Sequence, residues 1–370
     1  MDPKYVNIEL DYLKRLAAIP APSHNEDKRV EFLLNELKNI GVEGAYEDSA
    51  KNVIVPMGEG GQFTVYSAHT DVVFPDTTAL PVREEGGRLY APGVGDDTAN
   101  VAALLTIIRC ITENGLTPRE PVLFVFDSCE EGLGNLKGIR QIMRDFDGRI
   151  KELVSFDCSL DEGMVVRAVG SERWRITAAT AGGHSYGAFG KPNAIHRMAQ
   201  LITRLYSQEL PKENGQRTTY NAGVISGGTS INTIAQNAEL LYEYRSDEHS
   251  SLEFMRAQFM RLIEEADCPE ARFKAELIGE RPCGKNVDPA AQKRLLERCS
   301  RAIEQVTGSR PVVSTGSTDA NVPLSLGIPA ATFGLFIGEG AHTREEWLET
   351  GSLQTGLEIG LRLVVGGHFE

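Results

Sequence analysis

The sequence predicts an α/β fold, with a mainly parallel sheet covered by helices on both faces and an α+β domain inserted into it. Three observations lead to this prediction. The chain has 370 residues, more than one hydrophobic core usually serves. Strand and helix patterns alternate near both ends of the chain, as they do around parallel sheets. Between residues 172 and 281 the order becomes β-α-β-β-α-β, the ferredoxin-like or split βαβ unit.

The N-terminal segment supplies alternating helices and strands. A helix is expected from Ser23, where Ser23 and Glu26 have the spacing of a capping box, to Gly41, which acts as a stop. Val30 and Leu33 belong to its apolar stripe. The other elements expected before residue 172 are strands over 52–57, 63–69, 121–127 and 152–157, and helices over 96–115 and 135–146.

The pattern changes near residue 172. Alternating, half-exposed patterns predict strands over 172–180, 216–226, 238–246 and 271–279, with helices over 192–210 and 250–266. The α/β pattern then returns, with a helix over 290–308, a strand over 328–336 and a helix over 350–367. The first domain is therefore expected to be discontinuous, comprising 1–171 and 282–370, with 172–281 inserted.

Composition excludes some partners and environments. The formal net charge of −14 argues against nucleic acid and anionic membrane, because neither attracts an acidic surface. The first residues are polar and charged, and no apolar run approaches the length of a membrane span. The six cysteines are scattered without a CxxC pair, which predicts reduced thiols. We therefore expect a cytoplasmic protein.

Ionisable residues gather where the predicted strands and loops end. They are His69, Asp71, Asp96, Asp97, Asp127, Glu130, Glu131, Asp157 and, in a glycine-rich loop, His342. Taken singly, each has a structural explanation, since an aspartate at a helix start is usually a cap and paired glutamates are usually solvated. In an α/β sheet, however, functional sites form at the carboxyl ends of the strands, so these side chains are expected to lie together.

Such a cluster of acids requires positive charge. Converging carboxylates repel, and their ionised forms are stable together only when cations lie among them. Imidazole mixed with carboxylate suits zinc, with manganese or cobalt as competitors. Two histidines and three or more acids are too many for one tetrahedral zinc ion but suit two ions that share a carboxylate. Two metals activate a water, and one acid must stay off the metals as the base.

Five motifs resemble those of a known family. "SAHTDVV", "PGVGDDTAN", "DSCEEGLG", "SFDCS" and "GAHTREE" follow the order seen in the co-catalytic zinc peptidases and deacylases. That family includes peptidase T, the glutamate carboxypeptidases, acetylornithine deacetylase and succinyl-diaminopimelate desuccinylase. Each motif is weak alone, but five in order around an inserted βαββαβ domain are specific, and the similarity spans nearly the whole chain. The resemblance implies a di-metal catalytic domain interrupted by a lid and dimerisation domain.

The resemblance also implies a role for each residue of the cluster. The implied metal ligands are His69 and Asp157 for one ion, Glu131 and His342 for the other, and Asp96 as the bridge between them. Glu130 would be the general base. Asp71 would orient the His69 imidazole through its second nitrogen. The choice of Asp96 over Asp97 as the bridge comes from the family, and the roles of Asp97, Thr98 and Asp127 stay open.

The inserted domain carries further candidates. The segment around His184 resembles one that places a histidine in the active site of the partner subunit, where it would stabilise an oxyanion. Asn232 resembles a substrate contact, and Arg245 stands where relatives grip a substrate carboxylate. The structural alternatives are a turn residue for His184 and a surface salt bridge for Arg245. These resemblances imply a homodimer.

A loop before the last ligand carries three more candidates. Ser317, Thr318 and Asp319 are either substrate contacts or turn formers. One departure from the family is Thr98, where many relatives have lysine. Asp157 also matters, because aspartate at that place is commoner among aminopeptidase-like members and glutamate among deacylases.

These observations predict a metal-dependent hydrolase of small peptides, with two zinc ions per subunit and Glu130 as the base. Two alternatives stay open. One is an N-acyl amino acid deacylase with the same machinery. The other is a catalytically silent protein that only binds metals or small ligands.

Overall fold

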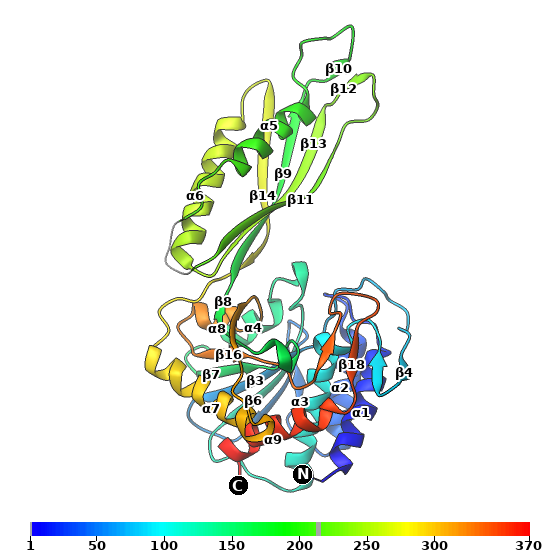
Figure 1. Cartoon of the computed structure of the whole chain (residues 1–370), viewed down its shortest axis with the longest axis vertical. Coiled ribbons are helices and arrows are strands. Elements are labelled where there is room, and N and C mark those ends of the chain that lie inside the picture. Colours follow the sequence, from blue (N-terminus) through cyan, green and yellow to red (C-terminus); the bar gives the residue numbers. More distant parts are fainter. Residues whose placement is uncertain (1, 212–215) are drawn as a thin grey trace. The chain divides into compact units, whose positions relative to one another are not determined.

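The computed structural model describes residues 2–211 and 216–370 of the chain. They form two compact units, coloured along the sequence in Figure 1. Met1–Ala168 and Lys285–Glu370 make the first unit, and Val169–Gly284 makes the second. The first unit is therefore discontinuous in sequence, and the second is a single continuous insertion.

The first unit is built on an eight-stranded, mainly parallel sheet. Its strands are β1 (Tyr46–Glu47), β2 (Val53–Met57), β3 (Phe63–His69), β6 (Val122–Asp127), β7 (Ile150–Ser155), β8 (Met164–Ala168), β15 (Val313–Gly316) and β16 (Ala330–Thr332). Their order in the sheet is β1-β2-β6-β3-β7-β16-β8-β15. The central run β6-β3-β7-β16 is parallel throughout, so these strands end at one edge.

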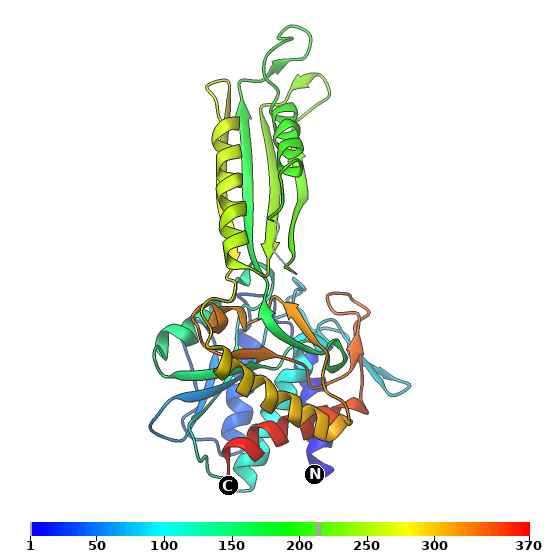
Figure 2. The same cartoon turned by 60° about the vertical axis from the view of Figure 1, so that its left-hand side comes forward.

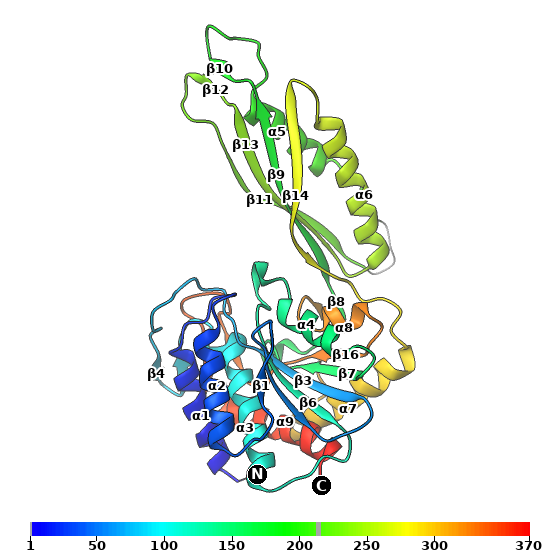
Figure 3. The ribbon, with the colours of Figure 1, turned by 180° about the vertical axis from the view of Figure 1, so that it is seen from behind.

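Helices cover both faces of this sheet. They are α1 (Lys4–Ala17), α2 (Asp27–Asn39), α3 (Asn100–Glu113), α4 (Lys137–Asp145), α7 (Pro289–Thr307), α8 (Asn321–Ser325) and α9 (Ser352–His368). Tyr66 and Phe124 pack with α1, α2, α3, α7 and α9, whereas their neighbours Val65 and Leu123 pack with α4 and α8. Figure 3 shows α1, α2 and α3 together, and Figure 2 shows α7 and α9, gold and red, side by side. Among the described residues, no helix is long and apolar enough to cross a membrane.

A small antiparallel sheet joins two distant segments of the first unit. Its strands are β4 (Arg83–Glu85), β5 (Arg88–Tyr90), β17 (Gly338–Glu339) and β18 (Trp347–Glu349), in the order β17-β18-β5-β4. This sheet fixes the hairpin that contains His342 beside the segment that leads into Asp96.

The second unit is a four-stranded antiparallel sheet with two helices. Its elements are β9 (Gly170–Thr180), β10 (Gly183–His184), α5 (Ala194–Tyr206), β11 (Thr218–Gly227), β12 (Thr233–Ile234), β13 (Asn237–Ser246), α6 (His249–Ala266) and β14 (Ala271–Arg281). The sheet order is β11-β13-β9-β14, and β10 pairs with β12 as a separate ribbon. Residues from α5, α6, β9 and β13 share one apolar core, so alternate strand residues face the helices.

The structure corrects several expected elements. The capping box at Ser23 is wrong: α2 begins at Asp27, and the Ser23 hydroxyl donates instead to Asp71 Oδ2 at 2.6 Å. The helix expected from residue 96 begins later, at Asn100 (α3), because Asp96 and Asp97 in the preceding turn, Val94–Ala99, have non-helical backbone angles. The strand expected over 328–336 shortens to the three residues of β16.

The first unit also holds a buried histidine in α9. His368 is 3% exposed, and its Nε2 lies 3.0 Å from the Tyr66 hydroxyl oxygen. Burial, together with the Arg298 guanidinium, lowers the pKa of His368 to about 4 from an ordinary 6.5. Between these two pH values the unfolded chain binds more protons than the folded chain. We therefore expect the free energy of unfolding to fall as pH drops through this window, by up to about 1.4 kcal/mol per pH unit.

A His368→Gln variant tests this expectation, because glutamine keeps a donor for Tyr66 but does not titrate. Urea unfolding of metal-free wild type and variant between pH 4 and 7 should give a shallower pH dependence for the variant. Exposed His196, replaced by glutamine, is the control. Equal slopes for wild type and His368→Gln would contradict the assignment.

Candidate metal centre and active site

The structure brings all five predicted metal ligands to one edge of the large sheet. They come from the end of β3 (His69), the loops after β6 (Glu131) and β7 (Asp157), the turn before α3 (Asp96) and the β17–β18 hairpin (His342). The segments after β3, β6 and β7 lie close together because the carboxyl ends of these parallel strands meet at the same edge.

Asp96 lies between the two histidines. Its Oδ1 is 3.1 Å from His69 Nε2, and its Oδ2 is 3.0 Å from His342 Nε2. The side chain is only 17% exposed. One carboxylate thus offers a different oxygen to each imidazole, which is the arrangement of a bridging ligand.

A second acid lies near each histidine, Glu131 near His342 and Asp157 near His69. Glu131 Oε1 lies 3.0 Å from His342 Nε2, and Asp157 Oδ1 lies 3.9 Å from His69 Nε2. Ligand atoms of Asp96, Glu131 and His342 all lie within 4.8 Å of one another. Donors around a tetrahedral zinc ion are separated by about 3.3 Å when bonds are about 2.0–2.1 Å. The donor atoms therefore fit two neighbouring cations.

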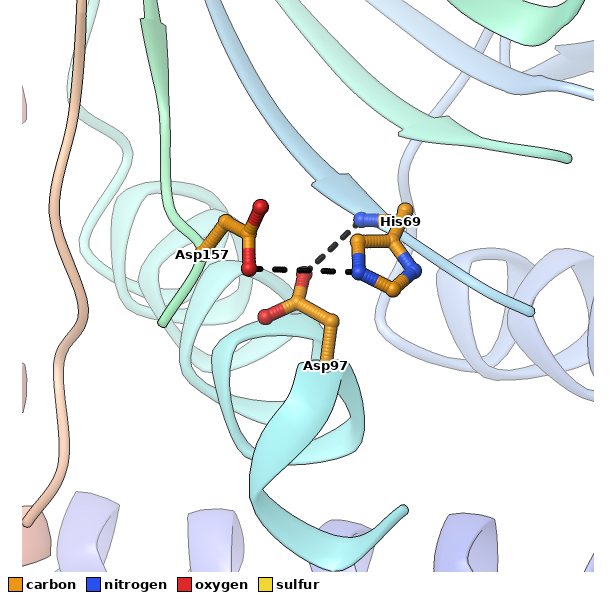
Figure 4. A group of neighbouring side chains, drawn as sticks. All are labelled: His69, Asp97 and Asp157. Atoms are coloured by element: carbon orange, nitrogen blue, oxygen red, sulfur yellow. Dashed lines mark hydrogen bonds and ion pairs between the residues drawn. The ribbon is translucent and has the colours of Figure 1, made fainter. Parts of the chain in front are cut away.

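Both carboxylate oxygens of Asp97 accept hydrogen bonds from nearby groups. Its Oδ2 accepts the His69 main-chain N–H at 2.8 Å, as Figure 4 shows, and its Oδ1 accepts from Asn100 Nδ2 at 2.6 Å. One Asp97 oxygen also lies within 4.8 Å of ligand atoms of His69 and Asp157. Proximity alone does not distinguish the two aspartates, but the hydrogen bonds favour Asp96 as the bridge and Asp97 as a support for His69.

Ionisation at this edge depends on the histidines. Hydrogen bonds to Asp96 and Glu131 raise the pKa of His342 to about 11. Burial opposes ionisation of Asp96, but His342 and His69 outweigh it and lower the pKa of Asp96. Burial and then the Asp96 charge raise the pKa of Glu131 to about 7. Without metal, histidine protons supply the positive charge that the acids require.

Asp71 holds the loop that carries the two glutamates. Its Oδ1 accepts the Glu130 N–H at 2.9 Å, and its Oδ2 accepts the Glu131 N–H at 3.1 Å. His69 Nδ1 lies 3.1 Å from the Asp71 main-chain carbonyl oxygen and 3.4 Å from Asp71 Oδ1. The Asp71 main-chain carbonyl is thus nearer to the His69 imidazole than the Asp71 carboxylate is. The carboxylate instead holds the loop that carries Glu130 and Glu131. Glu130 is 4% exposed, and its carboxylate is within 4.8 Å of ligand atoms of His69 and Glu131.

The candidates in the 317–319 loop lie at the edge of the first unit's core. Ser317 is half-buried, whereas Thr318 and Asp319 are buried. Thr318 Oγ1 accepts the Ala320 N–H, which matches the turn-forming alternative. Asp319 lies against Asp127, and burial raises the pKa of Asp127 to about 7. Asp127 thus belongs to a buried carboxyl pair.

His184 and Asn232 lie together at one end of the second unit. β10 pairs with β12, and the Ser185 N–H donates to the Asn232 main-chain oxygen at 2.9 Å. His184 is exposed, and its Nδ1 accepts the N–H groups of Tyr186 and Gly187, each at 3.3 Å. A neutral imidazole with an accepting Nδ1 carries its proton on Nε2.

Arg245 lies at the opposite end of the second unit, in its four-stranded sheet. It pairs in register with Ser171 near the start of β9, whereas Asn237, at the other end of β13, pairs with Ala179. Its guanidinium contacts both carboxylate oxygens of Glu243, at 2.9 and 3.1 Å. At about 3.3 Å per residue, β13 separates Arg245 from the His184 end by roughly 30 Å.

Sequence reasoning missed two supporting residues. Arg29 is fully buried, donates to the Thr70 carbonyl oxygen at 2.9 Å and faces the charges of Asp71 and Asp97. Glu346 is buried beneath the loop that carries Asp96. Only Glu346 had a possible signal, because it belongs to the motif that contains His342.

Comparisons with known proteins agree with this geometry. The pattern of peptidase family M20/M25/M40 matches residues 65–365. Succinyl-diaminopimelate desuccinylase of Methylocella silvestris is 23% identical over 361 residues, covering 91% of both chains. Carboxypeptidase G2 of Pseudomonas sp. strain RS-16 is 22% identical and covers 90% of this chain and 82% of its own.

Solved structures show the same fold. Aminopeptidase PepT from Bacillus cereus has a TM-score of 0.76 at 21% identity, over 97% of this chain and 98% of its own. A tripeptidase from Staphylococcus aureus has a TM-score of 0.77 at 22% identity, over 97% of both chains. A dinuclear metal-binding peptidase from Bacillus subtilis has a TM-score of 0.65 at 17% identity, over 98% of both chains. The chain therefore belongs to peptidase family M20/M25/M40 and is a hydrolase of amide bonds.

Proposed function

We propose that the chain is an exopeptidase that cleaves small peptides at a centre of two zinc ions. The observation that carries this proposal is the Asp96 carboxylate, whose two oxygens lie 3.1 Å from His69 Nε2 and 3.0 Å from His342 Nε2. Each side of Asp96 has a histidine and a second acid as donors.

The donor set supports zinc, with manganese or cobalt as competitors. His69 and Asp157 would hold one ion, and Glu131 and His342 the other, with Asp96 shared. Bound there, two such ions would polarise the scissile carbonyl and lower the pKa of an attacking water.

Glu130 is proposed as the general base. Its carboxylate faces the ligand atoms of His69 and Glu131, and its backbone is held by Asp71. In this role Glu130 takes a proton from the attacking water and returns it to the leaving nitrogen. Burial excludes bulk water from this proton transfer and keeps the carboxylate aimed at the site.

We further propose that the second unit is a ferredoxin-like lid and dimerisation domain. The sheet order β11-β13-β9-β14 supports a split βαβ topology. β11 is an edge strand with Val224 and Ile225 more than half exposed, which favours pairing with another strand. The Nε2 proton of His184 would donate to the oxyanion as it forms.

The separation of the second unit's candidates supports a homodimer. A tripeptide spans about 10 Å when extended, well short of the roughly 30 Å between His184 and Arg245 of one chain. If both residues contact one small substrate, they come from different chains. If the protein is not a homodimer, Arg245 is assigned only the salt bridge that it makes with Glu243.

Subunit mixing tests this arrangement. Glu130→Gln and His184→Ala homodimers are each expected to be nearly inactive. In a mixed dimer, one site combines a normal Glu130 with a normal His184 from the other chain. Random exchange should therefore restore about a quarter of wild-type activity, since half the dimers are mixed and each has one intact site. No recovery, with subunit exchange demonstrated by native mass spectrometry, would contradict a shared site.

The rival functions are separated by substrate. Asp157 favours a peptidase over an N-acyl amino acid deacylase, because aspartate at this place is commoner among aminopeptidase-like relatives. Free di- and tripeptides and N-acetyl amino acids should be assayed with zinc, manganese and cobalt in parallel. We expect higher kcat/KM on free peptides. A preference for N-acetyl amino acids would establish the deacylase, and no hydrolysis with fewer than two metals bound would establish a silent binding protein.

We also propose a cytoplasmic location. All six cysteines are free. Burial, which is the largest cause for each, raises the pKa of Cys129 and of Cys299 to about 12. A raised pKa makes these thiols slow to react, and free cysteines are usual in a reducing compartment. Cell fractionation should recover the protein with cytosolic markers.

A further inference from the structure

Glu346 is a buried acid that the proposed mechanism does not use. We propose that Glu346 is a positioning residue, which holds the bridging carboxylate of Asp96 in place through the backbone of the Gly93–Asp96 turn. This inference rests on the proposed two-metal function, because it assigns a task to that bridge.

The hydrogen bonds of the Glu346 carboxylate are all to main-chain N–H groups. Its Oε1 accepts from Gly95 and from Asp96, each at 2.8 Å, and its Oε2 accepts from Gly93 at 2.7 Å. The residue is 2% exposed. Three N–H donors satisfy the oxygens of this buried carboxyl group, although burial still raises its pKa to about 8. The Asp96 backbone therefore cannot rotate without breaking contact with Glu346.

The same hairpin supplies a ligand and this clamp. His342 lies in the loop between β17 and β18, and Glu346 immediately precedes β18. Trp347 pairs with Tyr90, and the Ala91 N–H donates to the Glu346 carbonyl oxygen at 3.2 Å. The backbone ladder thus fixes Glu346 opposite the turn that leads into Asp96. One hairpin therefore carries both His342 and the residue that holds the turn containing the bridge.

Three N–H donors require acceptor oxygens at position 346, and the close packing at Gly95 leaves little space for the side chain to move. A glutamine at 346 would turn an NH₂ group toward backbone N–H donors, so at least one of the three bonds would be replaced by repulsion. A Cβ at Gly95 would lie 2.8 Å from Glu346 Oε1 and 2.8 Å from the Phe336 ring. Gly95→Ala therefore disturbs the same contact from the opposite side.

The test compares Glu346→Gln and Gly95→Ala with Glu345→Gln, a neighbouring exposed control. Metal-free protein is titrated with Co²⁺ while visible absorption reports coordination geometry, and kcat and KM are measured for the loaded enzyme. We expect the weaker of the two Co²⁺ sites to lose about 10–100-fold in affinity in both variants, with an altered cobalt spectrum. We expect kcat to fall more than KM rises, and Glu345→Gln to match wild type.

The outcomes separate this inference from the proposed function. If wild type binds two Co²⁺ ions and hydrolyses peptides while Glu346→Gln has the same affinities and spectrum, the positioning role is wrong. Should the metal-free variants melt far below wild type with an unchanged cobalt spectrum, Glu346 serves folding alone, which also overturns it. If wild type itself binds fewer than two ions, the two-metal function fails first.

Discussion

Replacing Glu130 with glutamine is expected to lower kcat by a factor of about 10²–10⁴ while two metal ions stay bound. Glutamine has nearly the same shape but cannot take up and return a proton. The main-chain N–H at position 130 would still donate to Asp71, so the loop should keep its conformation. Steady-state kinetics and metal analysis by mass spectrometry measure the two effects separately.

Glu131 provides the matched control, because it is adjacent and equally held by Asp71 but contacts His342. Glu131→Gln should lose bound metal, and its activity should recover in part at high metal concentration. Near-normal turnover by Glu130→Gln would show that another group is the base. Metal loss by Glu130→Gln would instead make it a ligand.

Replacing Asp96 with asparagine is expected to weaken the binding of both ions by more than about 100-fold, the upper end for residues that only orient a ligand. Both oxygens of Asp96 face a histidine, and an amide keeps only one acceptor oxygen. The bridging negative charge would also be lost, so repulsion between the two ions would increase. Equilibrium dialysis with zinc measures the change, and hydrolysis should fall with it.

Asp97→Asn is the contrasting variant. Asp97 accepts from the His69 main-chain N–H and from Asn100, so asparagine can keep one of these bonds. We expect it to weaken metal binding by about 10–100-fold at most, as for an orienting residue. If Asp97→Asn stripped both ions while Asp96→Asn kept them, the bridge would have been assigned to the wrong aspartate.

Much of the fold follows from local patterns. Short apolar runs bounded by turn residues predicted β3, β6 and β7, and a clear alternation predicted the strands of the second unit. The small β17-β18-β5-β4 sheet was not predictable, because strands of two or three residues have no period. The start of α2 was mistaken because the Ser23 hydroxyl bonds to Asp71, a contact that forms only in the folded chain.

The site divides in the same way. Residue type and position predicted a cluster of acids and histidines, and the resemblance to the co-catalytic zinc peptidases singled out His69, Asp96, Glu131, Asp157 and His342 within it, which the structure brings together. Separating Asp96 from Asp97 required the hydrogen bonds that each makes. The role of Glu346 depends on backbone N–H groups that every sequence contains, so residue types alone do not reveal it.

The most direct test of the two-metal centre is anomalous X-ray diffraction at the zinc edge from crystals of the zinc-loaded protein. We predict two peaks, one beside His69 and Asp157 and the other beside Glu131 and His342, with an oxygen of Asp96 bound to each. A single peak, or two peaks bridged by Asp97 while Asp96 points away, would contradict the account.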